Sequence, residues 1–315
     1  MPLEVEVRPP WPLRLPRRRS EDGVMRFERG VLTRLLHIDT HPVVVHAWQR
    51  RDGTVVLRAT PSAGDPRTGD PARASGEGRV VRGAGPAAER LQIAIERMRF
   101  ALGVDDDYRE FYDTFRGDRL LGPAIRRRPW LRPRRNAWPW EALAWAVTKQ
   151  LIESPRAAAI QRRIVARWGP AVDGLRDVPD AATVAGAAPA ELAAMDLAPS
   201  RAVSLIKVAR DTAAGRADLD RPDADRRLLT VPGIGTWTVR CLGLFGRGDP
   251  DALPSGDLGY LKVIGRMAGL GRRATPDEVE QFFAPYAPYR GLAGTFTLAT
   301  YHAQVKRGPP LRRAA

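Results

Sequence analysis

Over most of the chain the apolar residues follow a helical period. From about residue 87 to residue 304 they recur three and four positions apart, and no strand-like alternation interrupts them. The segment that begins at Pro139 is an example, because one helical face collects Trp140, Leu143, Ala144, Val147 and Leu151. The pattern predicts about ten helices, near 87–102, 108–116, 139–152, 155–168, 189–195, 199–214, 223–229, 235–246, 257–268, 276–284 and 290–304.

The first 85 residues have a different pattern. Two valine-rich runs, 43–45 and 55–57, flank the turn-like Arg51-Asp52-Gly53 and predict a β-hairpin. We expect residues 1–30, which are basic and rich in proline, to be loosely ordered. Residues 61–86 are rich in Gly, Pro, Ser and Asp, which predicts a linker with a short strand at 79–81.

These patterns together predict a mainly α protein that is α+β overall. We expect a small β-containing domain with a basic leader and a linker over 1–85. An all-helical domain over 86–305 follows, and a basic tail over 306–315 ends the chain. The 315 residues are enough for about two domains.

The charge of the chain points to a polyanionic partner. Lys and Arg total 51 against 36 Asp and Glu, a net charge of +15, and only four of the basic residues are lysines. The single cysteine, Cys241, excludes an internal disulfide and an iron–sulfur cluster held by four cysteines. No run of about 18 apolar residues exists, so we expect no membrane partner. We also expect no metal site, because His37, His41 and His46 in the predicted strands lack cysteine partners.

The most informative segment is LLTVPGIGTWTVRCLGLFG, residues 228–246. A short helix ends, Gly233-Ile234-Gly235 forms a tight hairpin, and a new helix begins at Thr236. The backbone N–H groups of such a hairpin form an anion site, which would hold a DNA phosphate without reading the bases. Taken alone, the pattern fits an ordinary helix–turn–helix equally well.

A second motif follows at a fixed distance. Asp257 lies 22 residues after Gly235, in LPSGDLG, where a loop enters a helix. In an arbitrary protein, an aspartate at this place is most often a helix N-cap.

Together the two motifs, VPGIGTWTV and LPSGDLG, resemble the helix-hairpin-helix DNA glycosylases, the HhH-GPD superfamily, and most of all its 3-methyladenine glycosylase II branch. Further segments resemble helices of that family, and the likeness covers about residues 108–304: PWEALAWAVTKQLI (139–152), LAAMDLAPSRAVSLIKVARDTAAG (192–215) and APYRGLAGTFTLATYHA (287–303).

The resemblance implies a role for Asp257 and a base pocket around it. Asp257 matches the family's catalytic aspartate, whose carboxylate would stabilise the positive charge that develops on the sugar as the base leaves. Trp237 occupies the place of the nucleophilic lysine of related lyases, so the resemblance implies base removal without strand cleavage. Trp237 and Tyr286, or alternatively Tyr289, would line the pocket. Cys241 and Leu258 stand where relatives often carry aromatic residues.

The resemblance also implies DNA-contacting residues. Gly233, Ile234, Gly235, Thr236 and Thr238 would hold backbone phosphate. Lys149 and Gln150 precede Leu151, which matches the residue that relatives insert into the duplex when a base is flipped out. Core packing is an equally good interpretation of Leu151, which fits the apolar face of its own helix, and it is an alternative for Trp237.

The sequence therefore predicts a monofunctional DNA glycosylase of base excision repair. It would hydrolyse the N-glycosidic bond of alkylated purines such as 3-methyladenine and 7-methylguanine in damaged double-stranded DNA. We expect a monomer in the bacterial cytoplasm, associated with the nucleoid, that requires no cofactor beyond a monovalent cation at the hairpin carbonyls. The alternatives are the same fold acting on hypoxanthine or an oxidised base, a non-catalytic DNA-binding protein with the same hairpin, and a regulator.

Overall fold

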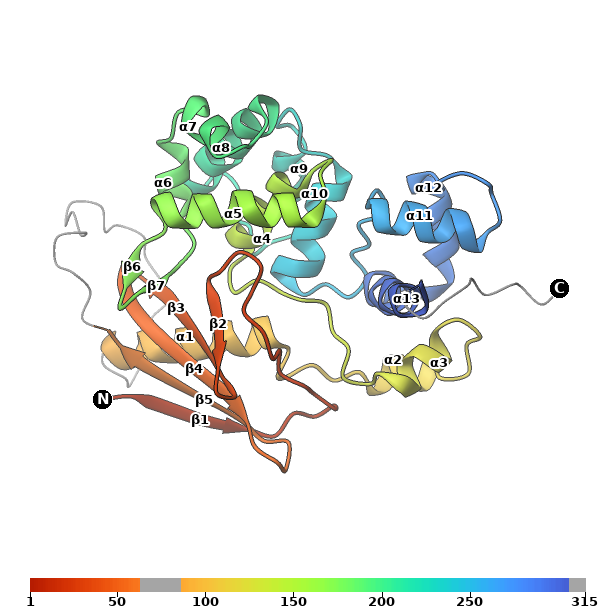
Figure 1. Ribbon diagram of the computed structural model, residues 1–315, viewed down its shortest axis with the longest axis horizontal. Helices are drawn as coiled ribbons and strands as arrows, with labels where there is room; N and C mark the ends of the chain where they lie inside the picture. The colour runs from red at the N-terminus through yellow and green to blue at the C-terminus, as the bar shows by residue number, and fades with distance from the viewer. Residues whose placement is uncertain (63–85, 306–315) are drawn as a thin grey trace.

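The computed structural model of the chain describes residues 1–62 and 86–305. Five antiparallel strands form one sheet in the order β1-β5-β4-β3-β2 (Figure 1). The predicted hairpin is confirmed, since β4 (His41–Gln49) and β5 (Val55–Pro61) pair with Ala47 opposite Leu57. The strand β3 (Val31–Ile38) lies on the other side of β4.

The prediction that residues 1–30 are loosely ordered is wrong. They contribute both edge strands, β1 (Leu3–Val7) against β5 and β2 (Met25–Glu28) against β3. Between these strands Leu13 and Val24 are buried. Edge strands need only a few alternating residues, and the prolines and arginines around them mask that signal. The strand predicted at 79–81 lies outside the described residues.

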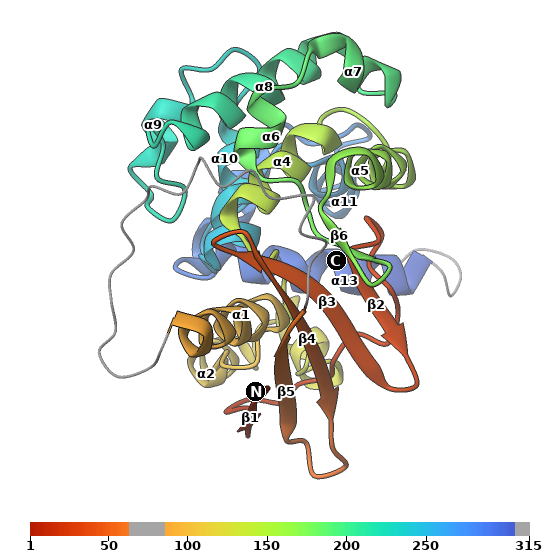
Figure 2. The same cartoon turned by 90° about the vertical axis from the view of Figure 1, so that its left-hand side faces the viewer.

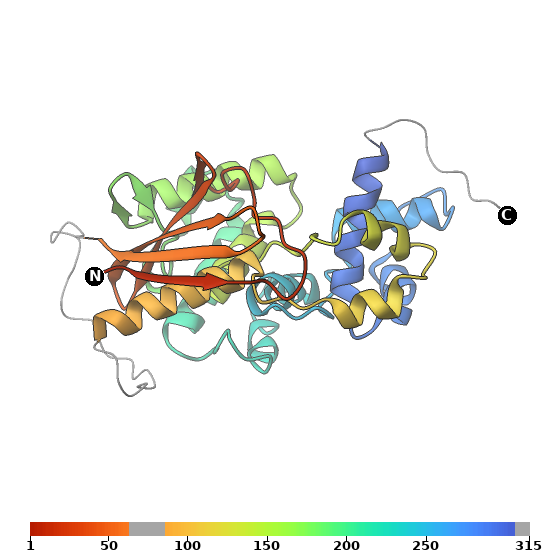
Figure 3. The same cartoon turned by 90° about the horizontal axis from the view of Figure 1, so that it is seen from below.

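The first helix, α1 (Pro86–Leu102), packs along one face of the sheet (Figure 3). Its residues Ala94, Ile95 and Met98 are fully buried in the same cluster as Val45 and Leu57. This helix therefore shares the core of the sheet. The domain boundary predicted at residue 85 falls outside the described residues and stays a prediction.

Two further helical groups complete the molecule, each around its own apolar core (Figures 1 and 2). The described residues contain thirteen α-helices in all, somewhat more than expected. The larger group consists of α4 (Pro139–Lys149), α5 (Ser154–Trp168), α6 (Ala181–Ala185), α7 (Pro189–Ala194), α8 (Pro199–Ala213), α9 (Ala224–Leu228), α10 (Thr236–Cys241) and the π-helical turn η3 (Leu242–Arg247). The smaller group consists of α2 (Arg109–Phe115), α3 (Leu121–Arg127), α11 (Leu258–Met267), α12 (Pro276–Phe283), the 3-10 turn η4 (Ala284–Tyr286) and α13 (Arg290–Val305).

The sequence pattern predicts a helical body without strands, and this prediction is wrong. A two-stranded hairpin, β6 (Ala171–Val172) and β7 (Leu175–Arg176), follows α5 and sets Val172 and Leu175 against Leu35 of the sheet. Strands of two residues are too short for a period of two to register in the sequence.

A buried ion pair joins the sheet to α4. The guanidinium of Arg34 on β3 donates two hydrogen bonds to the carboxylate of Glu141, at 3.2 and 2.8 Å, and both side chains are at most 3% exposed. Glu141 also accepts a hydrogen bond from the backbone N–H of Ala137, one turn ahead of it. The carboxylate of Asp177 lies 3.7 Å from the same guanidinium. Because both charges are out of water, removal of either partner leaves an unpaired buried charge and destabilises the fold.

We expect the substitution Arg34→Met to lower the free energy of unfolding by about 3–5 kcal/mol, because it leaves the Glu141 carboxylate buried and unpaired. The double variant Arg34→Met/Glu141→Leu should lose less than Arg34→Met alone. Urea unfolding measures both. The exposed pair of Arg50 and Glu6 on the same sheet supplies the control, since Arg50→Met should change little. If the double variant loses as much free energy of unfolding as Arg34→Met and Glu141→Leu lose in sum, the two residues are not a coupled buried pair.

Candidate functional site

The hairpin between α9 and α10 is built around Gly233. This residue has φ +84°, and a Cβ there would overlap the hydroxyl of Ser204 on α8. That hydroxyl donates a 2.7 Å hydrogen bond to the carbonyl of Pro232. Glycine is therefore required at 233 by backbone conformation and by space inside the protein.

Gly235 is different, because nothing inside the protein requires a glycine there. Its φ of −111° suits any residue, and a Cβ would meet no atom within 4 Å. Gly233, Gly235 and Thr236 are all exposed. Within the described residues, the N–H groups of the two glycines donate to no protein acceptor. The hairpin thus offers free donors on an open surface, beside the first turn of α10.

Gln150 connects the end of α4 to this hairpin. Its side-chain amide donates to the carbonyl of Gly233 at 2.8 Å and to the hydroxyl of Thr238 at 2.9 Å. Thr238 and Ile234 are themselves buried, and their N–H groups donate to the carbonyls of Gly235 and Val231. The structure therefore gives all three of these predicted DNA-contacting residues internal roles, and they position the hairpin.

Leu151 follows directly and is the largest departure from ordinary packing. The helix α4 ends at Lys149, so Leu151 lies outside the helix whose apolar face it seemed to continue. It is 93% exposed and has φ +58°, a conformation rare for a side chain that is not glycine. Core packing as its role is therefore wrong. The exposed Lys149 stands two residues before it.

The strained turn at Leu151 is held from below by Arg201 on α8. The Arg201 guanidinium donates to the carbonyl of Thr148 at 3.1 Å and to that of Gln150 at 3.0 Å. Together with the side chain of Gln150 it fixes residues 148–150, which lead into Leu151. Sequence reasoning missed Arg201 and Ser204. Both lie in the segment 192–215 that resembles the family, but their partners, Thr148, Gln150 and Pro232, are far away in the sequence.

Asp257 is the N-cap of α11. Its Oδ1 atom accepts a 2.7 Å hydrogen bond from the N–H of Gly259, and the side chain is half-buried. Within the described residues its second carboxylate oxygen has no hydrogen-bond partner. The loop that leads to it is fixed by Arg290, whose guanidinium binds the Asp251 carboxylate at 2.9 and 2.5 Å. The capping role and a free carboxylate oxygen therefore occur together.

Trp237 lies beside Asp257. Its ring is next to Gly256, where an added Cβ would be 3.6 to 3.9 Å from the Trp237 side chain. The ring is half-buried and belongs to no apolar cluster of the described residues, so core packing is not its role. Its indole N–H is buried and has no partner among them. Leu258, also half-buried, lies outside the same clusters and next to Asp257 in the chain.

Cys241 belongs to the same neighbourhood. It is buried one turn after Trp237 and Thr238 on α10. Burial raises the pKa of its thiol far above the ordinary value, the Asp257 carboxylate raises it further, and the Lys149 ammonium opposes that rise. The thiol is therefore neutral at pH 7, and it lies within electrostatic reach of both charged groups.

The two predicted tyrosines are part of an aromatic cluster in the smaller helical group. Tyr286 is buried with its ring centroid 5.3 Å from that of Phe115, and its hydroxyl is 3.4 Å from both carboxylate oxygens of Asp118. The Tyr289 ring is half-exposed and 5.5 Å from that of Phe111. The structure shows no contact of either tyrosine with Trp237 or Asp257.

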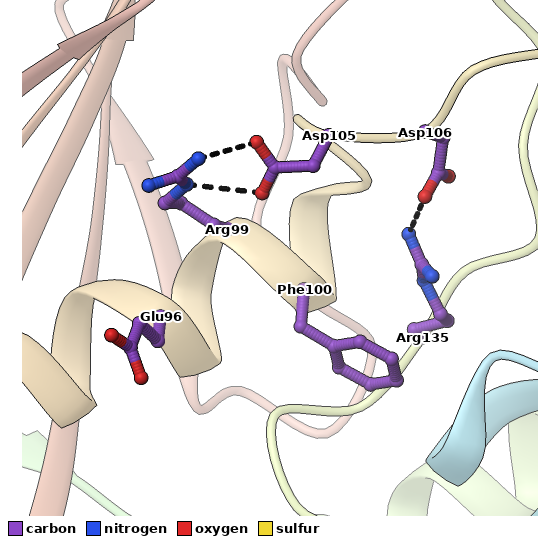
Figure 4. A pocket seen from close by; sticks show the side chains of 6 residues that line it. All are labelled: Glu96, Arg99, Phe100, Asp105, Asp106 and Arg135. Carbon is purple, nitrogen blue, oxygen red and sulfur yellow. Dashed lines mark hydrogen bonds and ion pairs between the residues drawn. The ribbon is translucent and has the colours of Figure 1, made fainter.

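A separate hollow lies between α1 and the loop that precedes α4, but its charged groups are occupied. Figure 4 shows Arg99 on Asp105 and Arg135 on Asp106, and the Arg135 guanidinium also lies 4.5 Å from the Phe100 ring centre. The remaining acid, Glu96, accepts a hydrogen bond from Gln92. The hollow is therefore a structural ion-pair network.

Residues 1–62 and 86–305 contain neither a metal-binding cluster nor a membrane-spanning helix. No group of three or more His, Cys, Asp and Glu side chains there is arranged to hold a metal ion. No helix of this part of the chain has the length and apolar character to cross a membrane.

The sole cysteine allows a direct test of the geometry around Asp257. We expect Asp257→Asn to lower the pKa of the Cys241 thiol, because it removes a negative charge that disfavours the thiolate. The S–H stretching band in the Raman spectrum, which comes from Cys241 alone, should then disappear at lower pH. The exposed Asp249 gives the matched control Asp249→Asn. Equal titration of the band in the two variants would place Asp257 away from the thiol.

Known proteins resemble the part of the chain that contains these residues. The family model described as "HhH-GPD superfamily base excision DNA repair protein" matches residues 144–288, which include Leu151, the hairpin and Asp257. A Bacillus subtilis protein named DNA-3-methyladenine glycosylase is 27% identical over 210 residues, 62% of this chain and 67% of that protein. A Mycobacterium tuberculosis protein named "Probable bifunctional transcriptional activator/DNA repair enzyme AlkA" is 27% identical over 71% of this chain. The match spans only 46% of the mycobacterial protein.

Solved structures extend the likeness to the whole fold. A 3-methyladenine DNA-glycosylase from Archaeoglobus fulgidus superposes with a TM-score of 0.73 at 19% identity, over 96% of this chain and 98% of its own. An 8-oxoguanine glycosylase/lyase from Clostridium acetobutylicum superposes with a TM-score of 0.60 at 14% identity, over 87% and 97%. At these identities the likeness shows a shared fold, which includes the N-terminal sheet.

Proposed function

We propose that this chain, whose residues 144–288 belong to the HhH-GPD superfamily of base excision DNA repair proteins, is a monofunctional DNA glycosylase that removes alkylated purines from damaged double-stranded DNA. Its relatives named DNA-3-methyladenine glycosylase support this substrate class. The matches span 46–67% of the lengths of these relatives and of the mycobacterial protein, so the activity of the whole protein is part of the proposal.

One observation carries the proposal: a hairpin with free amides, an exposed leucine, a tryptophan and a free carboxylate oxygen occur together. Gln150 joins the leucine turn to the hairpin, the hairpin begins α10, and Trp237 on α10 lies against the residue before Asp257. A protein that only grips DNA needs the hairpin alone. Capping of α11 uses one oxygen of Asp257, and such a protein needs neither the second, free oxygen nor an aromatic ring beside it.

In the proposed reaction the carboxylate of Asp257 acts on the sugar. Breaking the N-glycosidic bond builds positive charge on C1′ and O4′, and the ionised carboxylate stabilises that charge. The same group accepts the proton of the water that attacks C1′. An alkylated purine such as 3-methyladenine already carries positive charge and leaves without a strong acid. A single carboxylate is therefore sufficient.

Trp237 supports hydrolysis without strand cleavage. A lyase needs an amine that attacks C1′ to form a Schiff base, and an indole cannot do this. The half-exposed indole instead offers its face to a flipped base, and stacking of this kind contributes about 1–3 kcal/mol per base.

Leu151 fits the role of the residue that fills the gap in the duplex. Apolar side chains inserted between base pairs replace stacking that is lost when a base leaves the helix, at a cost of a few kcal/mol. Leu151 is 93% exposed, and the contacts of Gln150 and Arg201 fix the turn that carries it, so it is already in place for this role. The strain of its left-handed backbone, about 1–3 kcal/mol, is a further sign of function.

The hairpin carbonyls are the expected site of a monovalent cation. Those of Val231, Pro232 and Gly233 already accept hydrogen bonds from Ile234, Ser204 and Gln150. Each keeps a second lone pair, which a bound cation would use.

We propose that the protein acts as a monomer with no other cofactor.

The decisive variant is Asp257→Asn. Asparagine caps helices as well as aspartate does, so α11 should stay capped, and the melting temperature should change little. Release of 3-methyladenine and 7-methylguanine from methylated duplex DNA should fall by at least about 10²–10³-fold. Mass spectrometry of the released bases measures this under single-turnover conditions. DNA affinity serves as the control and should persist. Equal base release by variant and wild type would remove Asp257 from the mechanism.

The same assay separates the alternatives. Duplexes that carry hypoxanthine or 8-oxoguanine test another lesion class, and strand nicking tests lyase activity. Release of a neutral lesion alone would assign the fold to that lesion. Tight DNA binding without release of any base would support a non-catalytic binding protein.

The two hairpin glycines give a matched pair of variants. Gly235→Ala should leave the melting temperature unchanged, since a Cβ meets open space, and should weaken binding to lesion-free duplex by about tenfold because it crowds an approaching phosphate. Gly233→Ala should lower the melting temperature by several degrees, because its Cβ overlaps Ser204. Fluorescence anisotropy and thermal unfolding measure the two effects. Unchanged DNA affinity in Gly235→Ala would contradict phosphate binding by the hairpin.

A further inference from the structure

A hollow of about 340 Å³ opens directly beside the hairpin. Its wall consists of the chain just before the hairpin, Thr230, Val231 and Pro232, together with charged side chains of α8, of the loop after it, and of α9: Lys207, Arg210, Asp211, Arg216 and Arg227. The helices α8 and α9 lie next to each other at the outer edge of the larger helical group (Figure 2). We name this hollow the α8–α9 pocket.

The α8–α9 pocket is strongly electropositive. Four of its side chains are cationic and one is anionic, which leaves an excess of three positive charges. The one acid, Asp211, is 7% exposed and is bound by two arginines, with Arg216 and Arg227 each 2.8 Å from one of its oxygens. Its negative charge is therefore already compensated inside the protein, and these guanidiniums remain about half exposed.

Lys207 is the free cation of the α8–α9 pocket. It is exposed, and within the described residues its ammonium has no carboxylate within 4.0 Å and no hydrogen-bond partner. Arg210, one turn further along α8, uses its Nε to donate to the carbonyl of Ala185. Arg210 is in the last turn of α8, where the helix dipole favours positive charge, and Lys207 lies one turn before it. That placement explains why cations are tolerated there. It does not explain why four converge on a hollow beside the hairpin.

From this arrangement we infer that the α8–α9 pocket binds a second phosphate of the DNA backbone, on the strand whose neighbouring phosphate contacts the hairpin. The ligand is a phosphodiester anion held by Lys207, Arg210 and the exposed guanidinium edges of Arg216 and Arg227. The inference rests on the proposed function for the identity of the partner. It adds a site that lies outside the hairpin and away from Trp237 and Asp257. Because phosphate contacts carry no base information, the pocket strengthens binding to damaged and undamaged duplex equally.

The test uses Lys207→Ala, which removes an unpaired exposed charge and should leave the fold intact. Losing one phosphate contact should reduce the slope of log Kd against log salt by about 0.9 and weaken binding about eightfold at 0.1 M salt. The effect should be the same for lesion-free and lesion-containing duplex, and Lys207→Arg should restore it. The matched control is Arg51→Ala, which removes an exposed charge in the turn between β4 and β5. Arg51→Ala should change neither the salt slope nor the single-turnover rate of base release at saturating protein.

A second measurement identifies the phosphate. Single methylphosphonate linkages, which are uncharged, are placed one at a time along each strand of the duplex. For the wild type, a methylphosphonate at either of two groups of positions should weaken binding. In Lys207→Ala, substitution at one of these groups should no longer affect the affinity. In Gly235→Ala, substitution at the other group should no longer affect it.

The outcomes separate this inference from the proposed function. A salt slope for Lys207→Ala equal to that of Arg51→Ala, with one group of sensitive phosphates, would overturn the pocket and leave the glycosylase proposal standing. If Lys207→Ala shows the reduced salt slope but the wild type releases no base, only the glycosylase proposal is wrong. If the wild type binds no duplex DNA, both are wrong.

Discussion

The site depends on the buried pair of Arg34 and Glu141, because that pair fixes the start of α4. Glu141 reaches the sheet through Arg34 and the preceding turn through the N–H of Ala137. One helical turn later, the Trp145 indole donates to Asp22 in the N-terminal segment, at 2.9 Å. The helix α4 is thus anchored to the β-sheet domain at one end and presents Leu151 at the other. The N-terminal sheet therefore supports the surface that we propose to bind DNA, because it anchors the helical group that contains the hairpin.

At its far end α4 meets the hairpin through one amide side chain. The hydrogen bonds of Gln150 to Gly233 and Thr238 join the turn of the exposed Leu151 to the hairpin with its free backbone amides. A residue that enters a duplex must be held at a fixed distance from the phosphate that anchors the protein, since small errors in position are costly. Arg201 completes the support from α8, the same helix whose exposed side contributes Lys207 to the α8–α9 pocket. The turn of Leu151, the hairpin and the α8–α9 pocket are consequently held in place by one set of contacts.

How far the sequence predicts this protein depends on the range of the signal. The helices, the β4–β5 hairpin, the Gly233–Gly235 turn and the N-cap at Asp257 are local patterns, and the structure contains all of them. Contacts over long sequence distances left no readable trace: Arg34 and Glu141 are 107 residues apart, and Gln150 and Gly233 are 83 apart. Periodicity also fails to show where a helix ends, which is why Leu151 was open to interpretation as a core residue. Tyr286 shows the converse, since an aromatic residue in a recognisable motif became part of an aromatic cluster.

The backbone at Leu151 sets two selective pressures against each other. A left-handed turn is easiest for glycine or asparagine, and an apolar side chain in water gains nothing from folding, so thermal stability alone would disfavour leucine at this position. Laboratory evolution that screens only for heat resistance should therefore replace Leu151 early. Under the proposed function, the resulting protein would lose base release without any sign of misfolding. A stabilised form of this protein is best engineered with position 151 held constant, and with the gains sought in the sheet and in α1.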